Sequence, residues 1–261
     1  MAIRIGPAGL GPVKGALATL ESYHRHGFRA CEIAFTYGAY IKNEADARAI
    51  GQRARELDIA LSIHAPYFIN LNSNDADKRE SSKKRILECC RVGALLGVKR
   101  VVFHPGYYNT DKVKSYQTIQ KEIGAMLAEV RKKEWLIALA PEIMGKVNVF
   151  GSCDEIASLV RETGCDCCID FAHLLARNKQ INYQDIALKF PQKKWHVHFS
   201  GIIYGDKGEK RHRTTTREEW KELLKNLPKD KEIIIINESP TMVEDCAEGL
   251  EIARSLDLQL I

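Results

Sequence analysis

The sequence predicts an α/β fold, a single (β/α)8 TIM barrel, and two observations support this prediction. Eight short apolar runs alternate with segments in which apolar residues recur every three or four positions, from one end of the chain to the other. No linker or low-complexity segment interrupts the alternation, and 261 residues is an ordinary length for such a barrel. We therefore expect residues 1–261 to form one domain.

A doubly wound open sheet is the alternative fold, and the first turn of the chain argues against it. Such a sheet carries a glycine-rich phosphate-binding turn after its first strand. Here that turn reads IGPAGLGP, and no ribose-binding acid follows it at the right distance. The barrel is therefore the better prediction.

The elements can be placed in order along the chain. The expected strands are residues 2–6, 30–35, 60–64, 100–104, 136–142, 167–170, 195–199 and 232–238. The clearest helical patterns between them cover residues 75–97 and 115–133, and helix C-caps are expected at Gly27, Gly97 and Gly164. The segment after the seventh strand, SGIIYGDKGEKRHRTTTR, is expected to be a long basic loop.

Composition narrows the class of protein. Hydrophobic residues make up 45% of the chain and charged residues 28%, as in a globular protein with a large core. The formal net charge of +5 and the pI near 8.7 suit a polyanionic partner. No signal peptide and no membrane-spanning segment is recognisable, so we expect a cytoplasmic location and no membrane partner.

The eight cysteines are accordingly expected to be reduced. Cys165, Cys167 and Cys168 form a cluster in GCDCCIDFAH. No second C-x-x-C pair completes a four-thiolate metal site, so we expect these three residues to be buried strand cysteines.

Metal-type side chains stand at the ends of six consecutive strands. They are His64, His104, Glu142, Asp170, His198 and Glu238, with His173 three residues after Asp170. In a barrel all of these strand ends lie on one face. Crowded carboxylates would repel one another and take up protons, and a divalent cation removes that penalty. The sequence therefore predicts a metal site at the C-terminal face of the strands.

The types of ligand narrow the choice of metal. Imidazole nitrogen and carboxylate oxygen suit Zn²⁺, Mn²⁺ or Fe²⁺. The number of ligands exceeds what one zinc ion holds, so we expect two or more ions that share a bridging carboxylate, an arrangement suited to phosphoryl displacement. His196 lies on the same side of the seventh strand as His198 and is the alternative ligand there.

The rim of this face is expected to be basic and aromatic. In the loop after the seventh strand, His212 and Glu209 are further candidate ligands. Candidate phosphate-binding residues in the same loop are Lys207, Lys210, Arg211 and Arg213. Candidate base-stacking or wedging aromatics are Tyr67 and Phe68 after the third strand and Tyr107 and Tyr108 after the fourth.

With these residues in view, the chain resembles endonuclease IV, a family of metal-dependent apurinic/apyrimidinic endonucleases built on a TIM barrel. The matching segments are HAPYFINL, VVFHPG, PEIMGK, CIDFAH, HVHFSG, GEKRH and NESP. They run in the family's order and cover nearly the whole chain, and the set is specific although no single segment is.

The resemblance implies a base-excision repair enzyme with two to three Zn²⁺ ions. It would cleave double-stranded DNA on the 5′ side of an abasic site, leaving a 3′-hydroxyl and a 5′-deoxyribose phosphate. By this resemblance His64, His104 and Glu142 hold one ion, and Glu142 bridges to a second. The second ion's other ligands are Asp170, His198 and Glu238, and the third ion's are His173 and His212. Glu142, Asp170 and Glu238 would be the catalytic residues, and Tyr67 and Phe68 would match the loop that enters the minor groove. We expect a monomer.

Two departures from the family pattern matter. Many members present the third-metal ligands as Asp-x-His, whereas the matching triplet here is Lys210-Arg211-His212. Lysine cannot replace the acid, so either Glu209 takes its role or the third site is weaker. The loop after the second strand, TYGAYIKN, also lacks an arginine that some members insert into DNA, so Tyr37 or Tyr40 is expected to act there.

Two other functions stay open. A sugar isomerase or epimerase of the xylose-isomerase-like barrels would use one or two metals and an acid/base residue in a small closed pocket. A protein that binds damaged DNA without cutting it is the third reading, and the Lys210 departure favours it. The number of histidines and the basic, aromatic rim argue against the sugar enzyme.

Overall fold

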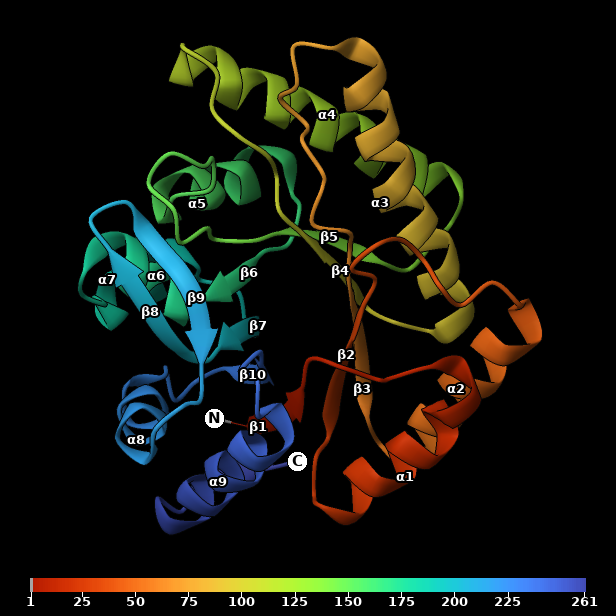
Figure 1. The fold of residues 1–261 in the computed structure, drawn as a ribbon, viewed down its shortest axis with the longest axis vertical. Coiled ribbons are helices and arrows are strands. Elements are labelled where there is room, and N and C mark those ends of the chain that lie inside the picture. Colours follow the sequence, from red (N-terminus) through yellow and green to blue (C-terminus); the bar gives the residue numbers. More distant parts are fainter. Residues whose placement is uncertain (1) are drawn as a thin grey trace.

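Eight parallel strands form the wall of a barrel in the computed structural model, which describes residues 2–261, and helices surround them (Figure 1). The wall strands are β1 (Ala2–Pro7), β2 (Ala30–Ala34), β3 (Ala60–His64), β4 (Arg100–Phe103), β5 (Ala138–Pro141), β6 (Cys168–Asp170), β7 (Lys194–Phe199) and β10 (Glu232–Asn237). The predicted (β/α)8 barrel is therefore confirmed, and each predicted strand boundary lies within two residues of the observed one.

Two hydrogen-bonded sheets make up the wall. One has the order β11-β1-β10-β7-β6, in which β11 (Gln259–Leu260) is a short strand that was not predicted, and the other has the order β2-β3-β4-β5. A parallel bridge between Glu142 and Cys168 joins the sheets on one side. On the other side the Arg29 amide donates to the Ile5 carbonyl at 3.1 Å. A Cβ atom at Gly6 would lie 1.7 Å from the Ala30 carbonyl oxygen, so only glycine lets β1 and β2 approach this closely.

The outer layer is helical. It consists of the 3-10 turn η1 (Val13–Gly15) and the helices α1 (Ala16–Arg25), α2 (Glu44–Glu56), α3 (Ala76–Leu96), α4 (Lys112–Lys132), α5 (Cys153–Thr163), α6 (Phe171–Asn178), α7 (Tyr183–Lys189), α8 (Arg217–Asn226) and α9 (Met242–Ser255). Side chains cap the start of many of them: Asp75 accepts from two amides of α3, and Ser152 with Glu155 forms a capping box on α5. Gly97 and Gly164 end α3 and α5 in the left-handed conformation, as predicted. Gly27 also has a positive φ but follows the C-cap His26 of α1.

The core lies between the barrel wall and the helices, with a second part inside the barrel. In β10, EIIIIN, three isoleucines are buried because a parallel strand covered on both faces is apolar along its length. Cys165, Cys167 and Cys168 are buried with free thiols as predicted, but only Cys168 lies in a strand, because β6 begins there. Within residues 2–261 no helix is long and apolar enough to cross a bilayer.

The segment after β7 is not the long loop that the sequence predicts. It forms an antiparallel hairpin, β8 (Gly201–Gly205) and β9 (Gly208–Arg213), which lies over α6 (Figure 1). Buried Ile202 packs against Ala172 and Ala176 of α6. This small apolar contact fixes the hairpin over the C-terminal face of the barrel, next to the strand ends.

Candidate metal centre

The predicted metal-type residues meet at the C-terminal face of the barrel. His64 and Asp170 are the last residues of β3 and β6, His198 is the second-last of β7, and the others directly follow β4, β5 and β10. Their side chains, with those of Glu209 and His212 from the hairpin, converge in three adjoining groups, of which the first two share Glu142. The groups are His64, His104 and Glu142; Glu142, Asp170, His198 and Glu238; and His173, Glu209 and His212. The strand ends thus deliver imidazoles and carboxylates to one small volume.

Glu142 stands between the first two groups. Its Oε2 atom lies 3.2 Å from His64 Nε2 and 3.1 Å from His104 Nε2. Its Oε1 atom faces the other way, 3.4 Å from His198 Nδ1 and 3.3 Å from His173 Nδ1. A carboxylate whose two oxygens face two different ligand groups has the arrangement needed to bridge two ions.

The donor atoms in these groups fit a divalent cation. Glu142 Oε1, Asp170 Oδ2 and His198 Nδ1 are buried, and none has a hydrogen-bond partner among residues 2–261. Two ligand atoms bound at the usual 2.0–2.1 Å to one tetrahedral ion lie about 3.3 Å apart. The separations of 3.1–3.4 Å around Glu142 match that spacing. Buried polar atoms that lack a partner are costly, and an ion would satisfy all three.

The third group depends on the hairpin. Glu209 Oε2 lies 3.4 Å from His173 Nε2, and the rings of His173 and His212 are 5.5 Å apart at their centroids. The Glu209 amide donates to the Gly145 carbonyl at 3.2 Å, which fixes β9 against the loop after β5. Glu209 therefore supplies the carboxylate of this group, and Lys210 does not belong to it.

A β-bulge explains how Glu209 and His212 can face the same way although three positions separate them. In the hairpin Glu209 pairs with Tyr204, Arg211 pairs with Ile203, and His212 pairs with Ile202. Lys210 is the extra residue, so the alternation of side chains shifts by one position after it. Directly paired residues share a face of the ladder, which places Glu209 and His212 with Tyr204 and Ile202 on one face.

Two glycines make this approach possible. A Cβ atom at Gly208 would lie 2.1 Å from the Gly145 carbonyl oxygen, and Gly208 has φ +91°. A Cβ atom at Gly145 would lie 2.8 Å from Glu209 Cβ and 2.9 Å from His173 Cδ2. Larger residues at either position would push Glu209 away from His173.

The electrostatics reflect the crowding of charged groups. Burial opposes ionisation of Glu142 and Glu238, but neighbouring histidines outweigh it: the pKa of Glu142 lies well below its usual value, and the pKa of Glu238 falls to about 2. The pKa of Asp170 rises to about 6, because burial and the nearby carboxylates of Glu142 and Glu238 oppose its ionisation. The charge of His173 lowers this pKa but does not cancel the increase. For His173, burial lowers the pKa, but Asp170 and Glu142 more than compensate, so its pKa lies well above the usual value. Without a cation, the charge balance of the site depends on these protons.

Sequence reasoning missed Glu32, a fully buried carboxylate in the middle of β2. Its Oε2 atom accepts from Ser62 Oγ at 2.7 Å and lies 3.0 Å from His196 Nε2, and its Oε1 atom lies 2.9 Å from His198 Nε2. His196 therefore faces Glu32, whereas His198 lies between Glu32 and the group around Glu142. The signal was an acid inside the apolar run ACEIAF, which is costly to bury without partners.

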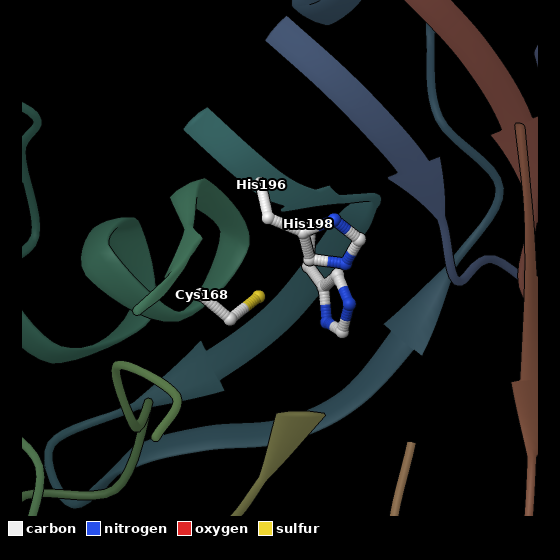
Figure 2. A group of neighbouring side chains, drawn as sticks. All are labelled: Cys168, His196 and His198. Atoms are coloured by element: carbon white, nitrogen blue, oxygen red, sulfur yellow. The ribbon is translucent and has the colours of Figure 1, made fainter. Parts of the chain in front are cut away.

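Cys168 lies beside both histidines. Figure 2 shows its thiol directed from β6 toward the rings of His196 and His198, which project from the same side of β7. Donor atoms of these three residues lie within 4.8 Å of one another. A sulfur atom thus stands below the nitrogen and oxygen ligands, although the ligand set predicted from the sequence contains none.

The rim residues surround a cavity of about 330 Å³. Tyr67 covers the first ligand group, with its ring centroid 5.1 Å from that of His64 and 5.4 Å from that of His104. Phe68 is half exposed, and the Arg85 guanidinium lies 4.8 Å above its ring. Tyr107 is half exposed at the cavity wall.

The remaining predicted DNA-binding residues lie in different environments. Tyr37 is almost fully exposed, whereas the Tyr40 hydroxyl donates to the Gly11 carbonyl. Lys210 and Arg211 are exposed on β9. Arg213 donates to both oxygens of Glu219, at 2.9 and 2.6 Å, so its guanidinium already has a partner.

The sequence of this chain is similar to a family of TIM barrels and to individual proteins. A family model described as xylose isomerase-like TIM barrel matches residues 20–256. An uncharacterized protein of Methanocaldococcus jannaschii, MJ0133, is 34% identical over 232 residues, which cover 83% of this chain and 84% of that protein. The probable endonuclease 4 of Mycobacterium tuberculosis is 26% identical over 125 residues, which cover 47% of this chain and 49% of that protein. The chain thus aligns with about half the length of the latter relative.

Solved structures with the same fold include both nucleases and sugar enzymes. The crystal structure of SacUVDE has a TM-score of 0.76 at 14% identity and covers 98% of both chains. D-psicose 3-epimerase, crystallised in the presence of D-fructose, has a TM-score of 0.70 at 16% identity and covers 97% of this chain and 98% of that one. Endonuclease IV from Thermus thermophilus has a TM-score of 0.68 at 19% identity and covers 97% of both. At such identities the likeness shows the fold alone.

Proposed function

The chain belongs to the xylose isomerase-like TIM barrel family, and from this premise we propose that it is a DNA-repair endonuclease of the endonuclease IV type. It would hydrolyse the phosphodiester bond 5′ to an abasic site. The observation that carries the proposal is the set of three adjoining ligand groups, with Glu142 between the first two and the Glu209 hairpin supplying the third. The similarity to a probable endonuclease 4 supports the same reading.

A sugar epimerase needs only part of this arrangement. The group of Glu142, Asp170, His198 and Glu238 would be sufficient for a single ion with acid/base carboxylates around it. The histidines of the other two groups would then have no ion to bind. Their presence on both sides of Glu142 favours a multinuclear site and phosphodiester chemistry.

The residues present fit two to three ions, Zn²⁺ first and Mn²⁺ or Fe²⁺ as alternatives. When bound, such ions supply positive charge for the phosphoryl oxygens and lower the pKa of water. His64 and His104 would hold one ion with Glu142, and Asp170, His198 and Glu238 a second with the same carboxylate. Glu209, with His173 and His212, would hold the third.

Hydrolysis would break the bond between phosphorus and the 3′ oxygen, with water as the nucleophile. The described residues that line the cavity include no serine or cysteine, and this scheme needs no covalent intermediate on the protein. Water adds its oxygen to phosphorus, and the 3′ oxygen leaves as a hydroxyl. Glu142, Asp170 and Glu238 act in this scheme by holding the ions in place around the phosphate.

The rim would bind the duplex. Phe68 and Tyr107 offer half-exposed rings at the rim, and Tyr37 is almost fully exposed. Lys210 and Arg211 on the outer strand of the hairpin offer cations for backbone phosphates. Tyr67 covers the metal groups and would contact the nucleotide that enters the cavity. The paired Arg213 is the weakest of the predicted DNA contacts.

One assay separates the three candidate functions. The protein, loaded with Zn²⁺ or Mn²⁺ or treated with a chelator, is incubated with a duplex oligonucleotide that contains one abasic site, with the undamaged duplex as control. Metal-dependent cleavage that leaves a 3′ end extendable by a polymerase supports the proposal. Binding without cleavage by the metal-loaded protein would leave a damage-recognition protein. Interconversion of ketoses such as D-fructose, with no action on DNA, would replace the proposal with an epimerase.

A further inference from the structure

Glu32, His196 and His198 form a buried network directly beneath the ligand groups, on the side of the barrel away from the cavity. Glu32 and His198 are fully buried, and His196 is nearly so. One oxygen of Glu32 is hydrogen-bonded to Ser62 and His196, and the other lies 2.9 Å from His198 Nε2. Glu32 and His196 have no place in the chemistry described above, yet Glu32 contacts the candidate ligand His198.

The two nitrogens of His198 lie in different surroundings. The Nδ1 atom is 3.4 Å from both Glu142 Oε1 and Glu238 Oε2, which matches the spacing of about 3.3 Å expected for ligands that share an ion. The Nε2 atom is 2.9 Å from Glu32 Oε1, which is a hydrogen-bond distance, although the N–H is not aligned with the oxygen, and is short for two ligands of one ion. Both atoms are buried and neither has an aligned hydrogen-bond partner in the part of the chain that the structure describes, so each lacks a partner other than the atom 2.9 Å away.

We infer that Glu32 is a positioning residue that fixes the tautomer of His198. It accepts the Nε2 proton of His198 and thereby leaves the Nδ1 lone pair free for a metal ion shared with Glu142, Asp170 and Glu238. A histidine ligand is commonly oriented in this way by a carboxylate on its second nitrogen. The inference rests on the metal site of the proposed function and adds the residue that prepares it.

The same distances argue against a separate thiolate site at Cys168. An ion held by Cys168, His196 and His198 (Figure 2) would draw on nitrogens of both rings. Each ring presents its Nε2 atom to Glu32 at hydrogen-bond distance, 3.0 Å for His196 and 2.9 Å for His198. The thiol therefore packs against the network, with the Nε2 atom of each ring directed to Glu32.

Glu32→Gln tests the inference because it keeps the volume and removes one acceptor. If the amide oxygen of the glutamine keeps the contacts with Ser62 and His196, the NH₂ group of the same side chain faces His198. An NH₂ group is a hydrogen-bond donor, so Nε2 of His198 would have to become an acceptor. The His198 proton would then move to Nδ1 and block the ion. We expect zinc affinity at this site to fall about 10- to 100-fold, as when other such partners of ligands are lost. Ser62→Ala is the matched control, since it removes a donor from the same carboxylate but leaves His198 in place, and it should change affinity less than threefold.

The readouts do not depend on nuclease activity. In the zinc-loaded wild type, ¹⁵N NMR of the histidine rings, with His198 assigned from a His198→Asn variant, should show the proton on Nε2. A proton on Nδ1 would overturn the inference, and this measurement needs no folded Glu32 variant. Unchanged zinc affinity in folded Glu32→Gln would overturn it as well. A thiolate-to-metal charge-transfer band in the Co²⁺-loaded protein, absent from Cys168→Ser, would assign the cluster to a thiolate site instead.

The outcomes separate this inference from the proposed function. Zinc binding with the expected tautomer but no cleavage of abasic DNA would overturn the nuclease and leave the role of Glu32 intact. Cleavage of abasic DNA by the wild type, together with unchanged zinc affinity in Glu32→Gln, would overturn the role of Glu32 and leave the nuclease intact.

Discussion

At the scale of single residues, Glu142 is the centre of the candidate site because it contacts more of the histidines than any other carboxylate that the structure describes. Its oxygens approach four histidines, two on each side, at 3.1–3.4 Å. Among the carboxylates of residues 2–261, only Glu142 belongs to two of the ligand groups. Loss of this one side chain should therefore disturb two ions and not one.

We predict that Glu142→Gln abolishes metal-dependent cleavage of abasic DNA. The amide keeps the shape but has only one oxygen, so it cannot serve both groups. Activity should fall by more than the roughly 10- to 100-fold that follows loss of a residue that only orients a ligand. Steady-state cleavage and metal content per chain are the measurements, with Glu155→Gln, at the start of α5, as a control away from the ligands. Retained activity with full metal content would mean that Glu142 is not a bridging ligand.

A second residue-scale prediction concerns protons. The metal-free chain holds a proton on Asp170 below pH 6, because burial and its carboxylate neighbours raise that pKa to about 6, and His173 and His198 also hold protons more strongly than usual. All three must lose these protons to bind an ion. Zinc affinity should therefore fall as the pH drops through 6, by at least about tenfold per pH unit. Calorimetry at pH 6 in buffers of different ionisation enthalpy should detect release of more than one proton.

The residue scale also shows what sequence alone could reach. The strand-end ligands were predictable because parallel strands of a barrel end on one face and because imidazoles and carboxylates there are costly without a partner. Glu32 was not found, since it lies in mid-strand and meets His198 only through the packing of β2 across the barrel from β7. The sequence places residues on a face but does not reveal which buried groups touch beneath it.

At the scale of elements, the β8–β9 hairpin decides the third ligand group. The departure at Lys210 left two alternatives, Glu209 as the acid or a weaker site, and the bulge favours the first because it makes Lys210 the extra residue and lets Glu209 share a face with His212. The sequence could not predict this, because strand propensity in a charged segment is weak and the bulge depends on pairing with β8. Charge density favoured a loop, whereas packing of Ile202 on α6 favoured a strand.

We predict that deletion of Lys210 keeps the third ion while Glu209→Gln loses it. Deletion gives a regular strand in which Glu209 and His212 are two positions apart and still share a face. Metal content per chain and zinc titration are the measurements, and Lys210→Ala is the matched control that preserves the bulge. Loss of one metal equivalent in the deletion variant, or none in Glu209→Gln, would show that Glu209 is not the acid of this site.

At the scale of the whole molecule, the ligand groups join strands that the backbone connects unevenly. The two sheets of the barrel wall meet through the bridge between Glu142 and Cys168 and a hydrogen bond from the Asp166 amide to the Leu139 carbonyl on one side, and through close contact of β1 with β2 on the other. Ions at Glu142 would connect β3, β4 and β5 of one sheet with β6, β7 and β10 of the other. The metal centre should therefore stabilise the barrel where its hydrogen bonding is weakest.

Removal of the ions should consequently lower the melting temperature. Ligands that bind only the native state contribute about 2.7 kcal/mol at a free concentration of one hundred times Kd. For a chain of this size 1 kcal/mol corresponds to about 2–4 °C, so chelation should lower Tm by about 5–10 °C. Calorimetry of the zinc-loaded and chelated protein measures the shift, and returned zinc should restore it. The same treatment should change Tm less in Glu142→Gln, because that variant has already lost the link between the sheets. An equal shift in both proteins would place the stabilising ion away from Glu142.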